Sequence, residues 1–582
     1  MTSGLAKESR TRLLDKLWEC QLSQGYISRS AIRKIAQDIQ IATIQVEGVI
    51  SFYHFFRTEP VGRYTIYLNN GAVAKLNGYK EVKEAFEKEA NTKFGSVSAA
   101  GSFGLFETSC IGLCDYEPAA LINFRPFVNL TPEKVAGIIK ALKQKQDIDT
   151  LADPIIDRVQ HTLGDDSVFF KPYYRGEILK KALKLTPGDI IEEIKWSGLS
   201  GRGGAFYPTG LKWDICRKGL NYQKYIICNA DEGEPGTFKD RLLLNNHIGL
   251  ILEGMILAGY TVGASKGFIY LRAEYLFLKH KIEDEIKLFH ALGLLGDQIL
   301  GQQDFDFDIR IQMGAGSYVC GEETALIQSM EGMRGEPRTK TFFPVEKGFR
   351  YKPTVVNNVE TFCAAARIIE MGGPAYRQMG TALSSGTKLF SVSGDCEKPG
   401  IYEIMWGTKI SKLLELCGAK DTKFIQWSGP SGTLLSQEDF GKEINNQDML
   451  CGGAVTIFDS RRDIIDVIRT FNSFFIEESC GLCTPCRAGN FLIGKKLKRI
   501  KKGKGAYNDL DDLLKWCEII KKTSRCGLGK TSCNAIIDML NKFGDEVEVL
   551  INDNGIELEH EFDINDYTND YSDFAIKMNS NA

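Results

Sequence analysis

Three closely spaced cysteines constrain this chain more than any other feature of its sequence. The run Cys480-Gly-Leu-Cys-Thr-Pro-Cys486 offers three thiolates, each separated from the next by two residues. Such a triplet can occupy three corners of a cubane iron–sulfur cluster, and a distant cysteine must supply the fourth corner. Cys526 is the better candidate, with Cys533 and Cys517 as alternatives. The predicted metal ligands are therefore Cys480, Cys483, Cys486 and Cys526.

Zinc is the competing interpretation of this motif, because four thiolates also suit that ion. Zinc sites more often pair two Cys-x2-Cys knuckles, whereas this chain has one triplet and one single cysteine, which favours the cluster. Most of the 16 cysteines stand singly in apolar surroundings, as small core residues do. Only one other group stands apart, the pair Cys110-x3-Cys114.

The bulk properties are those of an ordinary globular protein of three to five domains. The net charge is −3 over 582 residues, which gives no reason to expect nucleic acid as a partner. Residues 1–12 are polar and lack the apolar core of a signal peptide. The most apolar stretch, 247–271, is interrupted by Glu253 and Lys266, so we expect a buried helix and strand without stable membrane insertion. The predicted location is cytoplasmic.

Apolar periodicity divides the chain into a multi-domain α/β protein. A helical segment leads into a small α/β unit, in which Thr131 and Pro132 open a helix as N-cap and first residue. A large glycine-rich α/β region, a small β-rich region and a helical region with the cysteine triplet follow. The predicted boundaries are 1–146, a linker at 147–168, then 169–385, 386–455, 456–553 and an acidic tail at 554–582.

The run Gly201-Arg-Gly-Gly-Ala205 is a candidate phosphate-binding loop. Adjacent glycines let backbone amides approach a phosphate closely, and Arg202 and Lys212 would add positive charge. A tight structural turn explains the glycines about equally well. The run is not a Walker loop, because no Gly-Lys-Ser/Thr sequence closes it.

A second loop, Gly314-Ala-Gly-Ser-Tyr-Val-Cys-Gly321, resembles a dinucleotide fingerprint but departs from it. The third glycine would fall at Val319, so a standard Rossmann site is disfavoured. The loop is followed directly by Glu322 and Glu323, which can hold ribose hydroxyls or act as acid and base. The alternative is that the acidic pair caps a helix.

A third polar run, Asn229-Ala-Asp-Glu-Gly-Glu-Pro-Gly236, follows an apolar strand at 225–228. Ligands bind at the carboxyl ends of strands in α/β sheets, so this run favours function over a plain turn. None of the six histidines lies in a glycine motif or beside a candidate nucleophile. Chemistry carried by a cofactor accounts for that lack.

Together these motifs resemble a known family. With Asn357-Asn-Val-Glu-Thr and Glu478-Ser-Cys-Gly-Leu-Cys-Thr-Pro-Cys-Arg, they match in order and spacing the NADH-binding flavoprotein subunit of respiratory complex I and its relatives, over about 170–550. The first 150 residues resemble the thioredoxin-like [2Fe-2S] subunit of the same enzymes. Their fusion, and the runs 52–56 and 74–79, look most like the large diaphorase subunit of soluble NAD-reducing [NiFe] hydrogenases.

The resemblance implies a role for each matching residue. Glu234 would lie beside the flavin and the nicotinamide as the catalytic residue. FMN would be held by Gly201, Arg202, Gly203, Gly204, Lys212, Asn229, Asp231, Asn357 and Asn358. The NAD(H) pocket would be lined by Tyr318, Gly321, Glu322, Glu323, Lys340 and Phe343.

The chain departs from the family pattern at two places. The thioredoxin-like subunit carries a Cys-x4-Cys pair before its Cys-x3-Cys pair, and the first pair falls here on Asn69 and Ala74. Two thiolates cannot complete a site that needs four ligands, so we expect no [2Fe-2S] cluster in the N-terminal domain, which would act as a docking module. In the glycine loop, Phe206 and Tyr207 stand where the family has Gly-Phe.

The fold implied is a helical plus thioredoxin-like domain, a non-classical Rossmann-like FMN/NAD(H) domain, a β-grasp-like domain and a helical [4Fe-4S] domain. The function implied is that of an NADH:acceptor oxidoreductase, or diaphorase, because a flavin converts hydride transfer into one-electron transfer. The expected partners are a small diaphorase subunit with further iron–sulfur clusters and the small and large [NiFe] hydrogenase subunits. The alternatives are the NADH-input subunit of complex I or of an NAD-dependent formate dehydrogenase, and a non-catalytic scaffold.

Overall fold

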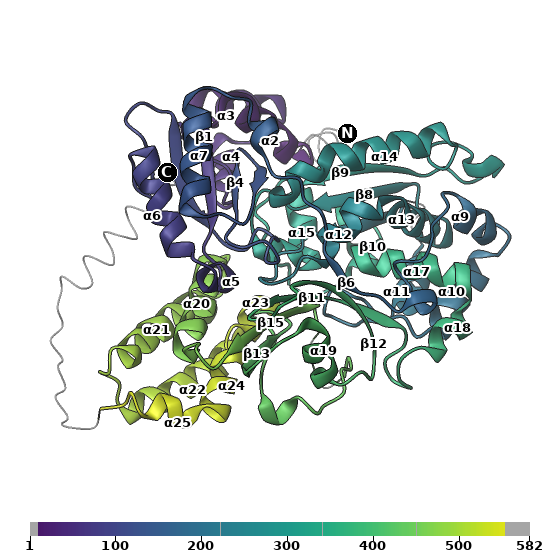
Figure 1. Ribbon diagram of the computed structural model, residues 1–582. Helices are drawn as coiled ribbons and strands as arrows, with labels where there is room; N and C mark the ends of the chain where they lie inside the picture. The colour runs from purple at the N-terminus through teal and green to yellow at the C-terminus, as the bar shows by residue number, and fades with distance from the viewer. Residues whose placement is uncertain (1–9, 221–222, 340, 448, 450, 553–582) are drawn as a thin grey trace.

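The computed structural model describes residues 10–220, 223–339, 341–447, 449 and 451–552. Three separate β-sheets, each with its own helices, and a final group of helices make up this part of the chain (Figure 1). The predicted acidic tail at 554–582 and Lys340 lie outside the described residues.

The N-terminal part joins three helices to a five-stranded sheet of order β2-β3-β1-β4-β5. Helix α7 begins as the sequence predicts, since the Thr131 side chain accepts a bond from the Lys134 amide at 3.2 Å and Pro132 is the first helical residue. The elements are α2 (Leu13–Gln24), α3 (Arg29–Asp38), α4 (Thr43–Ile50), β1 (Tyr64–Asn69), α5 (Ala72–Leu76), α6 (Tyr79–Ala90), β2 (Ser96–Val97), β3 (Phe103–Thr108), β4 (Ala120–Ile122), β5 (Arg125–Phe127) and α7 (Pro132–Lys143).

The central part is built on a four-stranded parallel sheet of order β10-β7-β8-β9, which consists of β10 (Thr354–Asn358), β7 (Tyr225–Ala230), β8 (Lys266–Leu271) and β9 (Asp308–Met313). Its helices are α9 (Glu177–Ala182), α10 (Pro187–Trp196), α11 (Thr209–Lys218), α12 (Lys239–Asn246), α13 (Ile248–Val262), α14 (Lys279–Ala291), α15 (Glu323–Met330), α16 (Pro344–Lys347), α17 (Val359–Met371) and α18 (Gly373–Gln378). Asn358 pairs with Asn229 in the parallel register. Two of the predicted polar motifs therefore meet at one edge of the sheet.

The apolar stretch of the sequence becomes α13 and β8, as predicted. Helix α13 is almost wholly buried between the sheet and α17, which explains its continuous apolar composition. Among the described helices, no single one is long and apolar enough to cross a membrane, and α12 with α13 reaches that length only as a pair bent by 94°.

The third sheet has six strands in the order β14-β13-β15-β11-β12-β6. Its elements are β6 (Val159–His161), β11 (Thr387–Gly394), β12 (Gly400–Met405), α19 (Ile410–Cys417), β13 (Thr422–Trp427), β14 (Thr433–Ser436) and β15 (Ala454–Asp459). The structure differs here from the predicted boundaries. The segment 147–168 contributes α8 (Ile148–Leu151) and β6, because β6 pairs with the otherwise open edge of β12, and β15 crosses the expected limit at 455.

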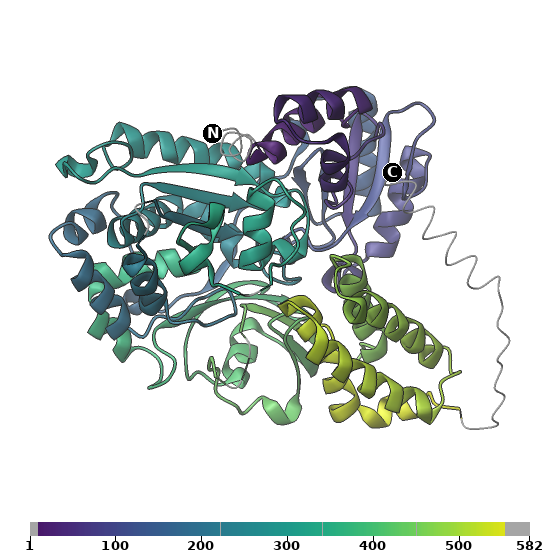
Figure 2. The ribbon, with the colours of Figure 1, turned by 180° about the vertical axis from the view of Figure 1, so that it is seen from behind.

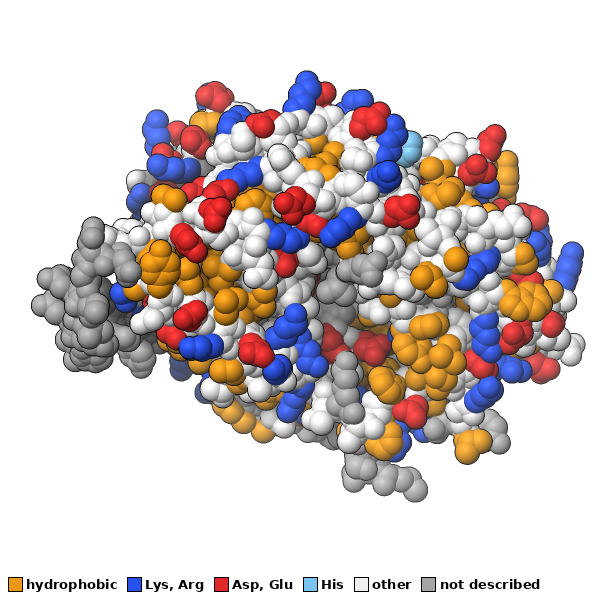
Figure 3. Space-filling model, turned by 90° about the horizontal axis from the view of Figure 1, so that it is seen from below, with side chains coloured by type: hydrophobic (Ala, Val, Ile, Leu, Met, Phe, Trp, Pro, Cys, Tyr) orange, Lys and Arg blue, Asp and Glu red, His pale blue; other side chains and the backbone are white. Residues whose placement is uncertain are grey.

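The C-terminal part is helical, and its elements are α20 (Ile464–Glu477), α21 (Thr484–Lys501), α22 (Tyr507–Thr523), α23 (Gly527–Thr531), α24 (Asn534–Lys542) and α25 (Gly544–Glu548). Seen from behind, these helices lie below the N-terminal part and beside the third sheet (Figure 2). Helix α5 contacts α20 and so links the two. On the face seen from below, side chains of both charges are interspersed with apolar ones (Figure 3).

Candidate functional site

The glycine loop 201–204 lies close to two other segments of the chain. A side-chain carbon on Gly203 would lie 3.2 Å from the Cβ atom of Asn358 at the end of β10. Gly204 has a φ of +106°, which favours glycine, and its missing Cβ would lie 3.6 Å from Gly452. The loop therefore presents backbone rather than side chains to the edge of the sheet, which fits the close approach of a phosphate.

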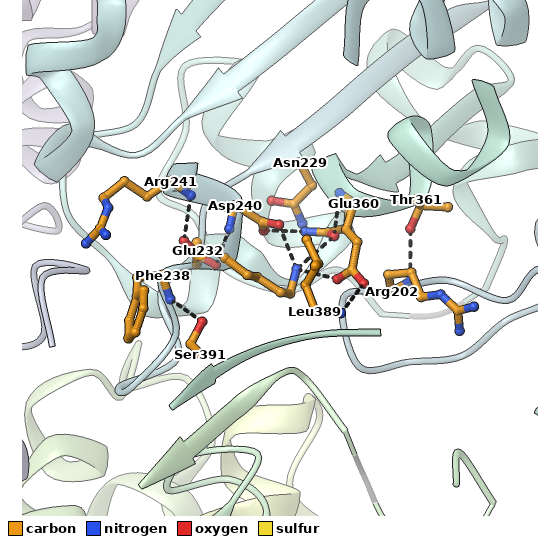
Figure 4. Close-up of polar contacts among 12 residues, drawn as sticks. Arg202, Asn229, Glu232, Phe238, Asp240, Arg241, Glu360, Thr361, Leu389 and Ser391 are labelled. Carbon is orange, nitrogen blue, oxygen red and sulfur yellow. Dashed lines mark hydrogen bonds and ion pairs between the residues drawn. The ribbon is translucent and has the colours of Figure 1, made fainter. Parts of the chain in front are cut away.

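Arg202 supports this loop from inside the protein. Its side chain is fully buried, and one guanidinium nitrogen donates to the Tyr376 hydroxyl at 2.7 Å and the Ser385 carbonyl at 2.8 Å. The guanidinium also lies 5.4 Å from the ring centre of Trp406. Figure 4 shows the side chain turned away from Asn229. The guanidinium thus anchors the loop to Tyr376 and Ser385 and does not face the edge of the sheet.

A buried ionic network lies beneath the same edge, and the sequence analysis missed it. Lys239 lies 2.6 Å from Asp240 and 3.0 Å from Glu360, and Lys388 pairs with Glu360 as well. Asn358 donates to Asp240 at 2.6 Å and accepts from Lys239 at 3.2 Å. The network therefore orients a predicted FMN ligand. Glu360, inside a motif already recognised, was the only signal for it in the sequence.

Burial sets the protonation of this network. Desolvation lowers the pKa of Lys388 to about 8, although the Glu360 carboxylate opposes it. Lys239 is equally buried, but Asp240 and Glu360 together raise its pKa above the usual value. The pKa of Glu360 is lowered because the two lysines outweigh its burial. A charged carboxylate between two ammonium groups thus lies under the sheet edge.

Asn229 and Asp231 occupy the carboxyl end of β7. The Asn229 amide donates to the Gly321 carbonyl at 2.8 Å, which joins two predicted motifs. Burial raises the pKa of Asp231 well above its usual range. Its Oδ2 atom is buried and has no hydrogen-bond partner among the described residues. An unpaired buried polar atom is costly, so this oxygen marks a position that a donor group of a ligand would fit.

Glu234 and Tyr318, predicted for flavin and NAD(H), lie in contact. The Tyr318 hydroxyl donates to Glu234 and lies 3.0 Å from the Ser431 hydroxyl. The Ser431 amide donates to the other carboxylate oxygen of Glu234 at 2.9 Å. Burial raises the pKa of Glu234, and the bonds from Ser431 and Tyr318 oppose that shift. The carboxyl group is held at both oxygens.

The two adjacent glutamates have different partners. Glu322 is the N-cap of α15 and accepts from the amides of Thr324 at 2.9 Å and Ala325 at 3.0 Å. Glu323 instead faces the glycine-loop side, where the Lys212 ammonium lies 3.2 Å from its carboxylate. Helix capping thus occupies Glu322, whereas Glu323 and Lys212 form an ion pair at the predicted site.

Three aromatic side chains near this site, the predicted Phe343 and the loop residues Phe206 and Tyr207, are at least partly exposed. Phe343 is 59% exposed and precedes α16. Phe206 adopts a φ of +50° and packs edge-to-face on Trp406, with ring centres 6.0 Å apart. Tyr207 is 41% exposed, and the Lys212 ammonium lies 5.9 Å from its ring centre. The two aromatic residues that replace Gly-Phe therefore lie in different surroundings.

The four predicted cluster ligands line one cavity. Its wall consists of Val319, Ser479, Cys480, Cys483, Cys486, Ser524, Cys526, Leu528 and Gly529. No three or more His, Cys, Asp or Glu side chains in the described part of the chain are arranged to hold a single metal ion. The alternatives Cys517 and Cys533 lie elsewhere, buried together in the core of the C-terminal helices. The structure thus brings Cys526, and not its alternatives, to the triplet.

A second pair of thiols lies in the N-terminal part. The sulfur atoms of Cys110 and Cys114 are 3.3 Å apart and buried. The hydrogen bond from Cys114 is the main cause that lowers the pKa of Cys110 to about 6. Asn69, at the end of β1, donates to Glu117, whose pKa burial raises well above its usual range.

Three family models match the chain. The FMN-binding domain of the Nuo51 family matches residues 194–367, and the iron–sulfur binding region of the NADH-ubiquinone oxidoreductase-F family matches 466–550. The thioredoxin-like [2Fe-2S] ferredoxin matches 3–143. That match contradicts our prediction that the N-terminal domain has no [2Fe-2S] cluster. The prediction counted thiolates at four positions, whereas the match covers the whole domain despite Asn69 and Ala74.

Individual relatives agree with these models. The chain is 46% identical over 550 residues to the alpha subunit of the NAD-reducing hydrogenase HoxS of Cupriavidus necator, covering 92% of this chain and 91% of the relative. It is 40% identical over 378 residues to the F subunit of the NADH-quinone oxidoreductase of Aquifex aeolicus, covering 64% and 88%. A crystal structure of NAD+-reducing [NiFe]-hydrogenase in the H2-reduced state superposes with a TM-score of 0.88 at 34% identity, covering 93% of both chains.

Proposed function

Because the chain belongs to the family of NAD-reducing hydrogenase diaphorase subunits, we propose that it transfers hydride reversibly between NAD(H) and FMN and passes single electrons through one [4Fe-4S] cluster to or from a hydrogenase module. The observation that carries this proposal is the placement of two adjacent residues. Tyr318 bonds to Glu234 at the predicted nicotinamide site, and Val319 lines the four-cysteine cavity. The two predicted centres are therefore separated by one loop.

The residues of the site can bind and position the two cofactors of this reaction. FMN, when bound, supplies the conversion between a two-electron and a one-electron carrier. The glycine loop would offer backbone amides to its phosphate, and the unpaired Asp231 oxygen would accept a bond from an O–H or N–H group of the flavin. Glu234, whose two oxygens are held by Tyr318 and Ser431, would lie beside the flavin. Glu323, paired with Lys212, binds the adenosine ribose of NAD(H).

Membership of this family also supports our assignments of the second cluster, the domains and the partners. The N-terminal match supports a second, [2Fe-2S] cluster in the thioredoxin-like domain, near Cys110 and Cys114. We assign a Rossmann-like character to the central part, predicted at 169–385, and a β-grasp-like character to the third sheet, which continues past the predicted limit of 455 to the end of β15 (Ala454–Asp459). The cluster domain then consists of the helices that follow β15. The partners are a small diaphorase subunit with further clusters and the hydrogenase small and large subunits, in the cytoplasm. The complex I alternative explains less of the chain, because such relatives match 64% of it.

An anaerobic optical titration with NADH tests this function. The purified chain, loaded with FMN and iron–sulfur clusters, should lose its flavin absorbance on addition of NADH and then bleach in the broad iron–sulfur region. A chain that holds no flavin, or a flavin that NADH does not reduce, would leave only the scaffold alternative.

A further inference from the structure

Tyr318 and Val319 lie in the loop that separates the two predicted centres, and we call this pair of residues the wall. Val319, which stands where a dinucleotide fingerprint has its third glycine, is 3% exposed and packs against the cavity of the four cysteines. Its neighbour Tyr318 places its ring 4.9 Å from that of Phe474 in the same apolar cluster and directs its hydroxyl to Glu234. The departure from the fingerprint thus has a physical purpose, because a valine closes the cavity where a glycine would leave a gap.

One carboxylate holds this wall in place. Glu478 follows α20 and lies two residues before Cys480, so its backbone is tied to the cluster segment. One of its oxygens accepts a bond from the Tyr318 amide at 2.8 Å, and the other accepts from the Ser109 hydroxyl at 2.9 Å. Ser109 precedes Cys110 in the N-terminal domain. Three domains therefore meet at the Glu478 side chain, which no step of the reaction uses.

We propose that Glu478 is a positioning residue that fixes the Tyr318–Val319 wall between the nicotinamide site and the [4Fe-4S] cavity. The inference rests on the proposed function and deepens it. Glu478 connects the two centres through one hydrogen bond and one short stretch of backbone, so that the Tyr318 hydroxyl and the Val319 side chain stay in register with the cysteines. Removal of the side chain would disturb both centres at once.

The donors and acceptors that each substitution at Glu478 offers determine whether the wall keeps its position. Alanine leaves the Tyr318 amide without an acceptor, and a buried unpaired donor is costly enough to shift the loop. Glutamine keeps one carbonyl oxygen for that amide, and the Ser109 hydroxyl can turn to accept from the new amide group. Aspartate keeps both oxygens but is one methylene shorter, so it cannot reach the Tyr318 amide unless the loop shifts toward it.

A displaced wall has a measurable effect at each centre. At the nicotinamide site, Tyr318 no longer holds Glu234, so NADH should bind more weakly. At the cluster, water enters beside Val319 and stabilises the more highly charged reduced form, which makes the midpoint potential more positive. The two effects should appear together, since both follow from the movement of one loop.

The experiment compares Glu478→Ala, Glu478→Gln and Ser109→Ala in the full chain loaded with FMN and clusters. Dye reduction gives KM for NADH, and an EPR-monitored redox titration gives the cluster potential. Glu478→Ala should raise KM about tenfold, as the loss of about 1.4 kcal/mol does, and move the potential positively. Glu478→Gln and Ser109→Ala should remain close to the wild type in both readouts.

Other results would overturn the proposal. They are a Glu478→Ala protein with unchanged KM and potential, a change in only one of the two, or a Glu478→Gln protein as impaired as the alanine variant. Should Glu478→Ala fail to fold, Glu478→Asp must show the same paired change to a smaller degree, or the proposal is wrong. A wild-type chain whose flavin NADH does not reduce would instead contradict the proposed function.

Discussion

At the scale of single residues, the sequence predicted candidate site residues but not which hydrogen bonds and ion pairs each of them forms. It placed Glu322 and Glu323 together and left helix capping open for the pair. The structure assigns the cap to Glu322 and the ion pair with Lys212 to Glu323. The sequence could not distinguish them, because the choice depends on where α15 begins relative to a lysine more than a hundred residues earlier in the chain.

Glu323 should therefore set the preference for NAD(H) over NADP(H). Its carboxylate accepts bonds from a ribose hydroxyl and repels the phosphate that replaces it in NADP(H). In Glu323→Gln the repulsion is gone and Lys212 is free to attract that phosphate. The ratio of kcat/KM for NADH over NADPH should fall by about ten- to a hundredfold.

Glu322→Gln is the matched control, because it makes the same change at the neighbouring residue. It weakens the cap of α15 and costs stability of about 1 kcal/mol or less, while the coenzyme ratio stays unchanged. A ratio that falls for Glu322→Gln and not for Glu323→Gln would show that the wrong carboxylate was chosen.

At the scale of elements, local signals were predictable and distant pairings were not. The N-cap of α7 at Thr131 and the buried helix α13 follow from nearby residues. The strand β6 was missed because its three residues gain their structure from β12, far away in the chain. The ionic network was missed for the same reason, since Lys239, Glu360 and Lys388 come from three separate elements.

This network should give the fold a characteristic pH dependence. The pKa of Lys388 falls from 10.5 to about 8 on burial, so between these values the unfolded chain binds a proton that the folded chain has released. Stability therefore rises with pH across this window. The gain amounts to at most about 3 kcal/mol, at about 1.4 kcal/mol for each pKa unit. Lys239 stays protonated in both states there and contributes no slope.

Thermal unfolding of wild type and Lys388→Met at the two ends of this window measures the effect. The melting temperature of the wild type should improve relative to that of the variant as the pH rises. The melting temperature of Lys398→Met, at an exposed lysine in the turn between β11 and β12, should change with pH as that of the wild type does. If the melting temperature of Lys388→Met also changed with pH as that of the wild type does, Lys388 would keep an ordinary pKa.

At the scale of the whole molecule, the N-terminal part supports the dinucleotide loop of the central part. The Trp18 indole donates to the Gly314 carbonyl at 2.9 Å, and the amides of His54 and Phe55 donate to Gly316 and Ala315 at 3.0 and 3.1 Å. The sequence showed the aromatic run at 52–56 and the glycine loop separately. Their contact joins segments more than 250 residues apart, and no local pattern encodes it.

Trp18→Phe should therefore weaken NADH binding from a distance. The variant keeps the apolar ring but leaves the Gly314 carbonyl without its donor, so we expect KM for NADH to rise about threefold to tenfold with FMN content unchanged. Trp196→Phe, at a 61% exposed tryptophan, is the control and should leave KM as it is. Equal KM values for both variants would mean that the N-terminal part does not hold the loop.

The most direct test of the electron path uses Cys483→Ser, with the buried Cys533→Ser as its control. After anaerobic mixing with NADH, optical and EPR spectra follow flavin and cluster together. We expect the flavin to bleach in all three proteins, whereas the [4Fe-4S] signal should appear only in the wild type and Cys533→Ser, and delivery to the hydrogenase partner should fail in Cys483→Ser. A [4Fe-4S] signal or normal delivery in Cys483→Ser would contradict it.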